Sequence, residues 1–288
     1  MSGAVQAGYA PPTGPDQPTS GRRWVRWLVA ATVLWAVLLA VLTWFSIRDD
    51  PPTVREQRSL AEAGPVTDRA VGELLAAAGD GGAARLLPDV LRTGCRITPM
   101  EDGAALTRGV EVLLPGDDAR GLLQRVADRL PASWRAGVET TGDGPVLRAD
   151  AGEFVAVEGH ATGADRVRFT AATGCRPVGD GYRPLAGGGG PETDQATALL
   201  RAWGGPAGQV DHVAAACPGG ATARTARAES APAADRPSLA DALAAARGGA
   251  VGVRATPEVY AWRAAGTSVV AERVDDRIRV TVTTGCDA

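Results

Sequence analysis

Two neighbouring residues of this chain of 288 residues have side chains that can exchange protons, Glu158 and His160. Both lie in the segment EFVAVEGH, residues 153–160, whose alternation of apolar and polar residues predicts a β-strand. Residues two apart on a strand share one face, so this carboxylate and imidazole can form an acid–base pair. An extracytoplasmic hydrolase or transferase using this pair is one hypothesis. We favour a second hypothesis, in which the two residues are an exposed ion pair at the end of a strand and have no catalytic role.

A second predicted polar surface comes from a segment that the sequence repeats. The segments DRVRFTAATGC, residues 165–175, and DRIRVTVTTGC, residues 276–286, are near copies of one predicted strand. Alternation turns one apolar row toward the protein interior and one polar row outward. The outward row consists of Arg166, Arg168 and Thr170 in the first copy and Arg277, Arg279 and Thr281 in the second. Such a row can receive an acidic polymer or an envelope protein, or it can be a solvated sheet face, which we favour.

Both copies end on a cysteine, and the chain has 4 cysteines in all. Four cysteines allow three pairings, but duplication of one bridged unit selects Cys95 with Cys175 and Cys217 with Cys286. The alternatives are a metal site or a redox pair. The sequence contains no Cys-x-x-Cys and no close His–Cys group, so we predict structural disulfides, no metal site and an oxidising compartment.

Other chemical signatures are missing from the sequence. It has neither G-x-S-x-G nor H-E-x-x-H, and all 30 of its basic residues are Arg. Without Lys there is no Schiff base and no phosphate-binding P-loop. The formal net charge of −3 gives no basic field for nucleic acid. We therefore predict no cofactor, no nucleic-acid partner and, on balance, no enzyme.

The repeated strand belongs to a longer duplication. Four pairs of matching positions occur in the same order, beginning at Thr67 and Thr193, Cys95 and Cys217, Gly137 and Gly252, and Cys175 and Cys286. Their separations fall steadily, as expected for two colinear copies of which the second has shorter loops. In each copy helical and strand-like periods follow one another, which predicts an α+β fold with an antiparallel sheet and helices packed on one face.

The predicted organisation has six parts. They are a disordered cytoplasmic tail at 1–23, a transmembrane anchor at 24–47, a juxtamembrane linker or helix at 48–64, a first α+β unit at 65–183, a Gly/Pro-rich linker at 184–191 and a second α+β unit at 192–288. The anchor is uncharged from Trp27 to Ile47 and is long enough to span roughly 30 Å of hydrocarbon as a helix. Arginines lie directly before the anchor, and all four cysteines lie after it. Both features predict that the amino terminus is in the cytoplasm.

Within the anchor, Thr32, Ala36 and Ala40 recur every four residues, a spacing at which two helices can approach closely and form a homodimer. The Ala, Gly and Arg content is typical of a GC-rich bacterial genome. Taken together, these features predict a single-pass protein of the bacterial cell envelope whose duplicated extracytoplasmic domains bind a partner or ligand. The alternatives are the enzyme described above and a structural subunit of an envelope complex.

Overall fold

The computed structural model describes residues 21–49, 58–232 and 238–286. Most of the predicted tail and residues 50–57 of the predicted linker lie outside the described residues. Helix α1 spans Gly21–Asp49, and its segment Trp24–Trp44 has the length and composition to cross a membrane. Thr32, Ala36 and Ala40 lie on this helix, and the Thr32 hydroxyl donates a hydrogen bond to the Leu28 carbonyl within it. Residues 54–288 form a second compact unit, which contains two similar domains.

The first domain contains two α-helices and six strands. Its elements are α2 Leu60–Ala78, β1 Ala83–Thr98, β2 Glu101–Leu113, α3 Ala119–Arg129, β3 Gly137–Thr141, β4 Gly144–Asp150, β5 Ala156–Gly163 and β6 Arg166–Ala172. Helix α2 begins within the segment predicted as a linker or helix, because Ser59 and Glu62 form a reciprocal capping box there. Asp118 caps α3 by accepting a hydrogen bond from the Gly121 backbone NH.

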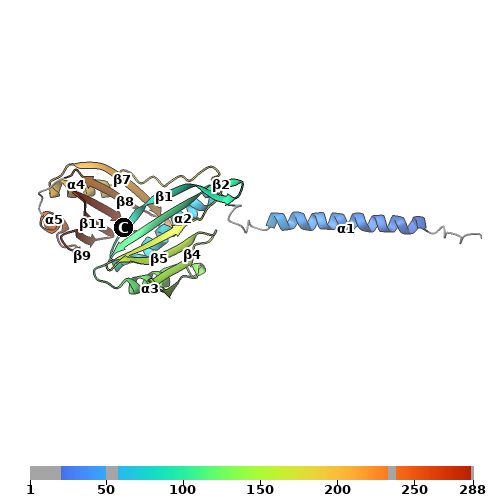
Figure 1. The fold of residues 1–288 in the computed structure, drawn as a ribbon, viewed down its shortest axis with the longest axis horizontal. Helices are drawn as coiled ribbons and strands as arrows, with labels where there is room; N and C mark the ends of the chain where they lie inside the picture. Colours follow the sequence, from blue (N-terminus) through green and yellow to red (C-terminus); the bar gives the residue numbers. More distant parts are fainter. Residues whose placement is uncertain (1–20, 50–57, 233–237, 287–288) are drawn as a thin grey trace, which may run out of the picture. The chain divides into compact units, whose positions relative to one another are not determined.

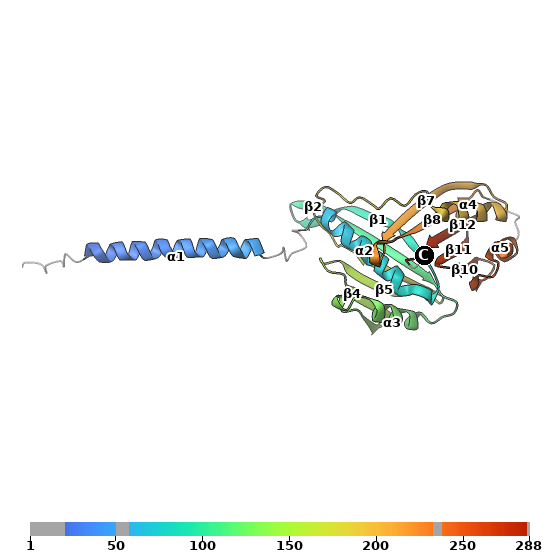
Figure 2. The same ribbon diagram turned by 180° about the vertical axis from the view of Figure 1, so that it is seen from behind.

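The second domain repeats this order. Its elements are α4 Pro191–Trp203, β7 Ala207–Ala216, β8 Thr222–Ser230, α5 Leu239–Arg247, β9 Val251–Ala255, β10 Val259–Ala264, β11 Thr267–Val274 and β12 Arg277–Thr284. Both sheets are antiparallel and have the same strand order, β1-β2-β6-β5-β4-β3 in the first domain and β7-β8-β12-β11-β10-β9 in the second. The predicted α+β fold with two related sheets and helices is therefore confirmed (Figures 1 and 2).

In each domain one face of the sheet packs against its helices. Val167, Phe169 and Ala171 of β6 are buried in the first core together with α2 and α3, and Ile278, Val280 and Val282 of β12 are buried in the second. Figure 2 shows α2 lying over the strands of the first sheet. The alternation of the repeated segment thus places its apolar row against the helices, as expected for a sheet covered on one face.

The two domains dock through the edge strand β1. Ala83 and Leu113 at this end of the first sheet pack on the face of the second sheet that is opposite its helices. The outward backbone NH groups of Ala84 and Leu86 donate to hydroxyls of the second sheet, Ser268 Oγ at 3.2 Å and Thr225 Oγ1 at 3.1 Å. An exposed strand edge invites unwanted pairing, so docking satisfies the edge and joins the domains at once.

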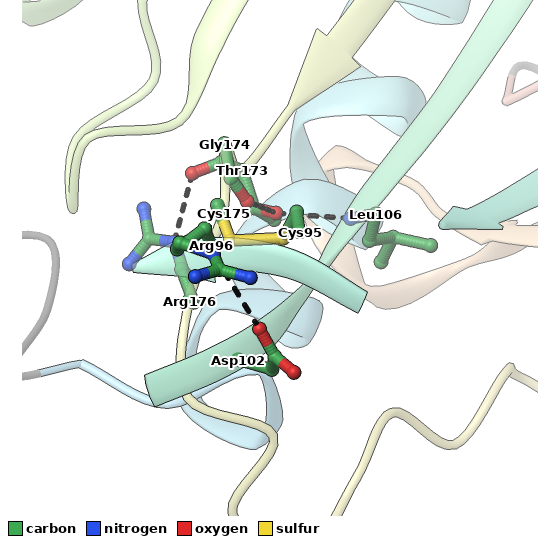
Figure 3. The surroundings of a disulfide bond; sticks show 8 residues. All are labelled: Cys95, Arg96, Asp102, Leu106, Thr173, Gly174, Cys175 and Arg176. Atoms are coloured by element: carbon green, nitrogen blue, oxygen red, sulfur yellow. Dashed lines mark hydrogen bonds and ion pairs between the residues drawn. A yellow bond between two sulfur atoms is a disulfide. The ribbon is translucent and has the colours of Figure 1, made fainter. Parts of the chain in front are cut away.

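Two disulfides lie within the domains. Cys95 is bonded to Cys175 and Cys217 to Cys286, which are the pairs that the duplication predicted. The first bridge ties the β1–β2 hairpin to the chain after β6 (Figure 3). Beside it, Arg176 Nε donates to the Thr173 carbonyl at 2.9 Å. The second bridge ties the chain after β7 to the chain after β12, so both copies of the bridge have the same place in the fold.

Candidate functional site at the domain junction

The first sheet brings five of the predicted site residues to one face. In the strand register Glu158 of β5 lies opposite Thr170 of β6, and His160 lies opposite Arg168. Both Glu158 and His160 are exposed. Arg166 and Arg168 instead reach the neighbouring strand β2, where Arg168 is 3.0 Å from Glu111. The acid–base pair therefore lies on an open sheet face.

The equivalent row of the second sheet has a different environment. Thr281 is only 2% exposed, so it does not contribute to an accessible surface. Arg279 donates a 2.8 Å hydrogen bond to Glu229, and the Arg277 side chain is half exposed. The predicted Arg–Thr row is thus partly exposed in the first domain, where Arg166 also pairs with Glu272 of the second domain, and is buried at Thr281 in the second.

A difference between the copies explains this asymmetry. Thr170 and Thr281 are equivalent, and their neighbours in the sheets are Glu158 and Val270. Charged residues keep this face of the first sheet in water, whereas Val270 is buried beneath the first domain. The face of the first sheet is exposed at Glu158 and His160, whereas the equivalent face of the second sheet is buried at Val270.

Five charged side chains form a cluster where the domains meet. Glu111 of β2 and Glu272 of β11 each pair with Arg85 and with Arg166. Arg166 lies 3.2 Å from Glu111 and 2.7 Å from Glu272. Arg168 is the fifth member, through Glu111. Burial alone raises the pKa of a carboxyl, but these arginines outweigh burial and hold the pKa of Glu111 and of Glu272 below the ordinary value.

This cluster predicts that acid weakens the fold. Because Glu111 and Glu272 have a lower pKa in the folded chain than in the unfolded chain, their contribution is present above the unfolded pKa and lost as the pH falls through the folded pKa. The free energy of unfolding, measured with urea between pH 7 and pH 3, should fall over the acidic part of this range. Glu272→Gln should reduce the slope. An equal slope in wild type and variant would contradict this assignment.

A second charged group is buried beside the junction. Arg108 of β2 is 2% exposed and points to the helix side of the first sheet. Its guanidinium pairs with Asp68 of α2 at 2.5 Å and with Asp89 of β1 at 2.6 Å. It also donates to the Ala214 carbonyl of β7 at 2.6 Å, which links it to the second domain. The Tyr182 hydroxyl lies 2.9 Å from Asp89 and 3.1 Å from Asp68.

Burial and charge act in opposite directions on these groups. Burial raises the pKa of Asp68 above its ordinary value, although Arg108 opposes the shift. Burial also raises the pKa of the Tyr182 phenol, so it remains a hydrogen-bond donor at neutral pH. For Arg108 burial alone lowers the pKa, but Asp89, Tyr182 and Asp68 outweigh it and raise the pKa. The cation is therefore fixed by its anionic neighbours.

A cavity of about 260 Å³ opens beside Arg108, between the domains and the chain that joins them. Its walls are formed by Pro88, Asp89, Arg108, Pro184, Leu185, Asp211, His212, Val213, Ala214 and Arg227. Two of the lining residues carry a buried polar atom without a hydrogen-bond partner in the structure, His212 Nδ1 and Arg227 Nε. The register pairs His212 with Ala226 and Arg227 with Asp211, so these two side chains lie on opposite faces of the second sheet. Apolar walls with a few convergent polar groups are typical of sites that bind small molecules. This cavity is the candidate functional site.

The sequence contained a signal for part of this site. Arg108 has the same parity as Leu106, Val110 and Val112 in β2, so alternation alone places it on the apolar face, where a charge requires a partner. His212 gave no signal, because the residues around the cavity are distant in the sequence. Within residues 21–49, 58–232 and 238–286, no three side chains of His, Cys, Asp or Glu gather as metal ligands.

Comparisons with known proteins do not supply a family for this fold and site. No protein-family model matches the chain, and no curated protein matches it. The function has to be argued from the geometry of the junction.

Proposed function

We propose that this chain is a single-pass membrane protein of the bacterial envelope whose two domains form an extracytoplasmic binding module. In this proposal the ligand is a small polar molecule and its site is the cavity beside Arg108. The observation that carries the proposal is the cavity at the junction, whose walls combine apolar side chains with Arg108, Asp211 and Arg227 from the two domains. A ligand with hydrogen-bonding oxygens suits these walls, because the arginine side chains are hydrogen-bond donors.

The anchor and the compartment are supported by two further features. Helix α1 has the length and composition of a membrane span, and the two disulfides are stable where thiols are oxidised. An amino terminus in the cytoplasm would place both domains on the oxidising side. An envelope protein or an acidic polymer would meet the module there, at the partly exposed row of Arg166, Arg168 and Thr170.

The cavity resembles a binding site more than a catalytic one. Its cations already have anionic partners, since Arg108 pairs with Asp89 and Arg227 lies 3.3 Å from Asp211. Such pairing holds the walls in place, which lowers the entropic cost of binding. Glu158 and His160 belong to β5 and do not line this cavity. We therefore expect a ligand to bind and leave unchanged.

A thermal-shift screen of the full-length protein in detergent tests the proposal. The panel consists of amino acids, small carboxylates, phosphates and sugars. A ligand at 100 times its Kd should stabilise the wild type by about 2.7 kcal/mol, which raises Tm by several degrees. Arg227→Gln should abolish the shift, and Arg96→Gln, whose site lies on the distant β1–β2 hairpin, should keep it.

Two outcomes would contradict the cavity as the site. One is a panel that leaves the Tm of the wild type unchanged. The other is a ligand whose shift survives both Arg227→Gln and Leu185→Trp, since the second change fills the cavity with a larger side chain.

A further inference from the structure

A second groove lies between the domains, on either side of one ion pair. Asp80 belongs to the turn Gly79–Gly81 that follows α2, and it pairs with Arg263 of β10. Two hollows, of about 210 and 500 Å³, share these two residues in their walls. The smaller is also lined by Ser268 and Thr283, and the larger by Ala250, Val251 and Ala265. The ion pair thus lies in the shared wall of two neighbouring hollows, which we call the groove.

Arginines gather around the turn that carries Asp80. Arg129 Nη1 lies 2.9 Å from where a side-chain carbon on Gly79 would be, and Arg125 Nη2 lies 3.9 Å from the corresponding position on Gly81. Arg247 Nε donates a 3.2 Å hydrogen bond to the carbonyl of Ala250, a residue that lines the larger hollow.

The side chains described above include one anion of the turn, Asp80. The cations are Arg125, Arg129, Arg247 and Arg263. Arg125 has a further partner in Asp118 at 3.5 Å, but both side chains are largely in water and the pair is weak. The four arginines named around the groove therefore outnumber the two carboxylates that pair with them, Asp80 and Asp118.

Asp80 is poorly held apart from its contact with Arg263. Its side chain is 93% exposed, whereas that of Arg263 is 22% exposed. Gly79 has φ +47° and Gly81 follows, so a glycine without a Cβ stands on each side of Asp80. The Arg263 guanidinium, in contrast, is fixed by a strand and also donates to the Asp80 carbonyl at 2.9 Å.

We propose that this groove binds an anionic ligand and that the Asp80 carboxylate is its built-in competitor. The ligand is a molecule with two or more phosphate or carboxylate groups. One group replaces Asp80 on Arg263, where the planar fork of a guanidinium holds an oxyanion through two hydrogen bonds. A second group lies near Arg129 and Arg125. The site is separate from the cavity beside Arg108, so each can fail independently of the other.

Calorimetric titration of the full-length protein with inorganic tripolyphosphate tests the proposal, with orthophosphate as the probe that carries a single group. Tripolyphosphate should bind more tightly than orthophosphate. Asp80→Asn should tighten tripolyphosphate binding about threefold, because the competing charge is gone. Arg263→Gln should weaken it about tenfold, the effect of one charge-assisted hydrogen bond. Binding should also weaken as the salt concentration rises.

Charge-matched variants distinguish binding in this groove from general electrostatic attraction of the anion to the protein. Arg129→Gln removes a cation of the groove without touching Asp80 and should weaken binding about threefold. Arg96→Gln removes the same charge from the β1–β2 hairpin, where the side chain is 69% exposed, and should leave the affinity unchanged. The proposal is overturned if Asp80→Asn does not tighten binding, if Arg96→Gln weakens it as much as Arg129→Gln does, or if neither wild type nor Asp80→Asn binds tripolyphosphate.

Discussion

Replacing Arg108 with Gln is expected to lower the free energy of unfolding by about 3 to 5 kcal/mol, the cost of breaking a buried ion pair by removing one partner. The Arg108 side chain is 1% exposed, and its guanidinium pairs with two carboxylates, those of Asp68 and Asp89. Without it these carboxylates face each other and Tyr182 in a buried site. Urea unfolding at pH 7, followed by circular dichroism, measures the loss.

Two variants make this prediction specific. Arg96→Gln removes an arginine whose side chain is 69% exposed and should change the free energy by less than about 0.5 kcal/mol. Adding Asp68→Asn to Arg108→Gln should recover part of the loss, because one stranded charge is then removed. A loss below about 1 kcal/mol for Arg108→Gln, or no recovery in the double variant, would show that the buried charges are not coupled as the distances indicate.

The same residue shows how far periodicity can predict the fold. The duplication and the alternation predicted two sheets with helices on one face, because these patterns are local and are repeated in both copies. The apolar row of β6, which includes Val167 and Phe169, was placed correctly for this reason. Alternation also puts Arg108 on the inner face, but local pattern cannot tell which distant carboxylates meet it there.

The docking of the two domains also could not be predicted from the local sequence pattern, although the composition of one strand indicates it. Strand β11 is apolar on both faces, with Val269 turned to the helices and Val270 to the first domain. Such a strand is typical of a sheet that is covered on both sides. The matching strand β5 keeps Glu158 and His160 on its outer face. The contrast between copies indicates which sheet is covered, but the partner that covers it is set by long-range packing.

The candidate cavity could not be predicted for a similar reason. Asp89, Leu185 and His212 come from the first domain, the connecting chain and the second domain. Their approach depends on the position at which β1 docks on the second sheet. Docking in turn depends on individual contacts such as Leu86 NH with Thr225. Residue types in one sequence do not fix such a position.

Removing the Cys217–Cys286 bridge should have an effect as large as losing Arg108. The cysteines are 69 residues apart, and closing a loop of that length in the unfolded chain stabilises the fold by about 4 kcal/mol on the chain-entropy model. Cys217 is 6% exposed and belongs to the core that α2 shares with β7, so the bridge also supports the junction. Urea unfolding of the double variant Cys217→Ala/Cys286→Ala under oxidising conditions measures the loss.

The matched control is the bridge of the first domain, Cys95–Cys175, whose separation of 80 residues predicts almost the same entropic effect. Both of its cysteines are partly exposed, so dithiothreitol should reduce this bridge before it reduces the one that contains buried Cys217. If each double variant loses about 4 kcal/mol, loop closure accounts for both bridges. A much larger loss for Cys217→Ala/Cys286→Ala means that the bridge also holds the domains together, because only this pair lies in the shared core. A loss near zero for either pair contradicts a structural role for that bridge.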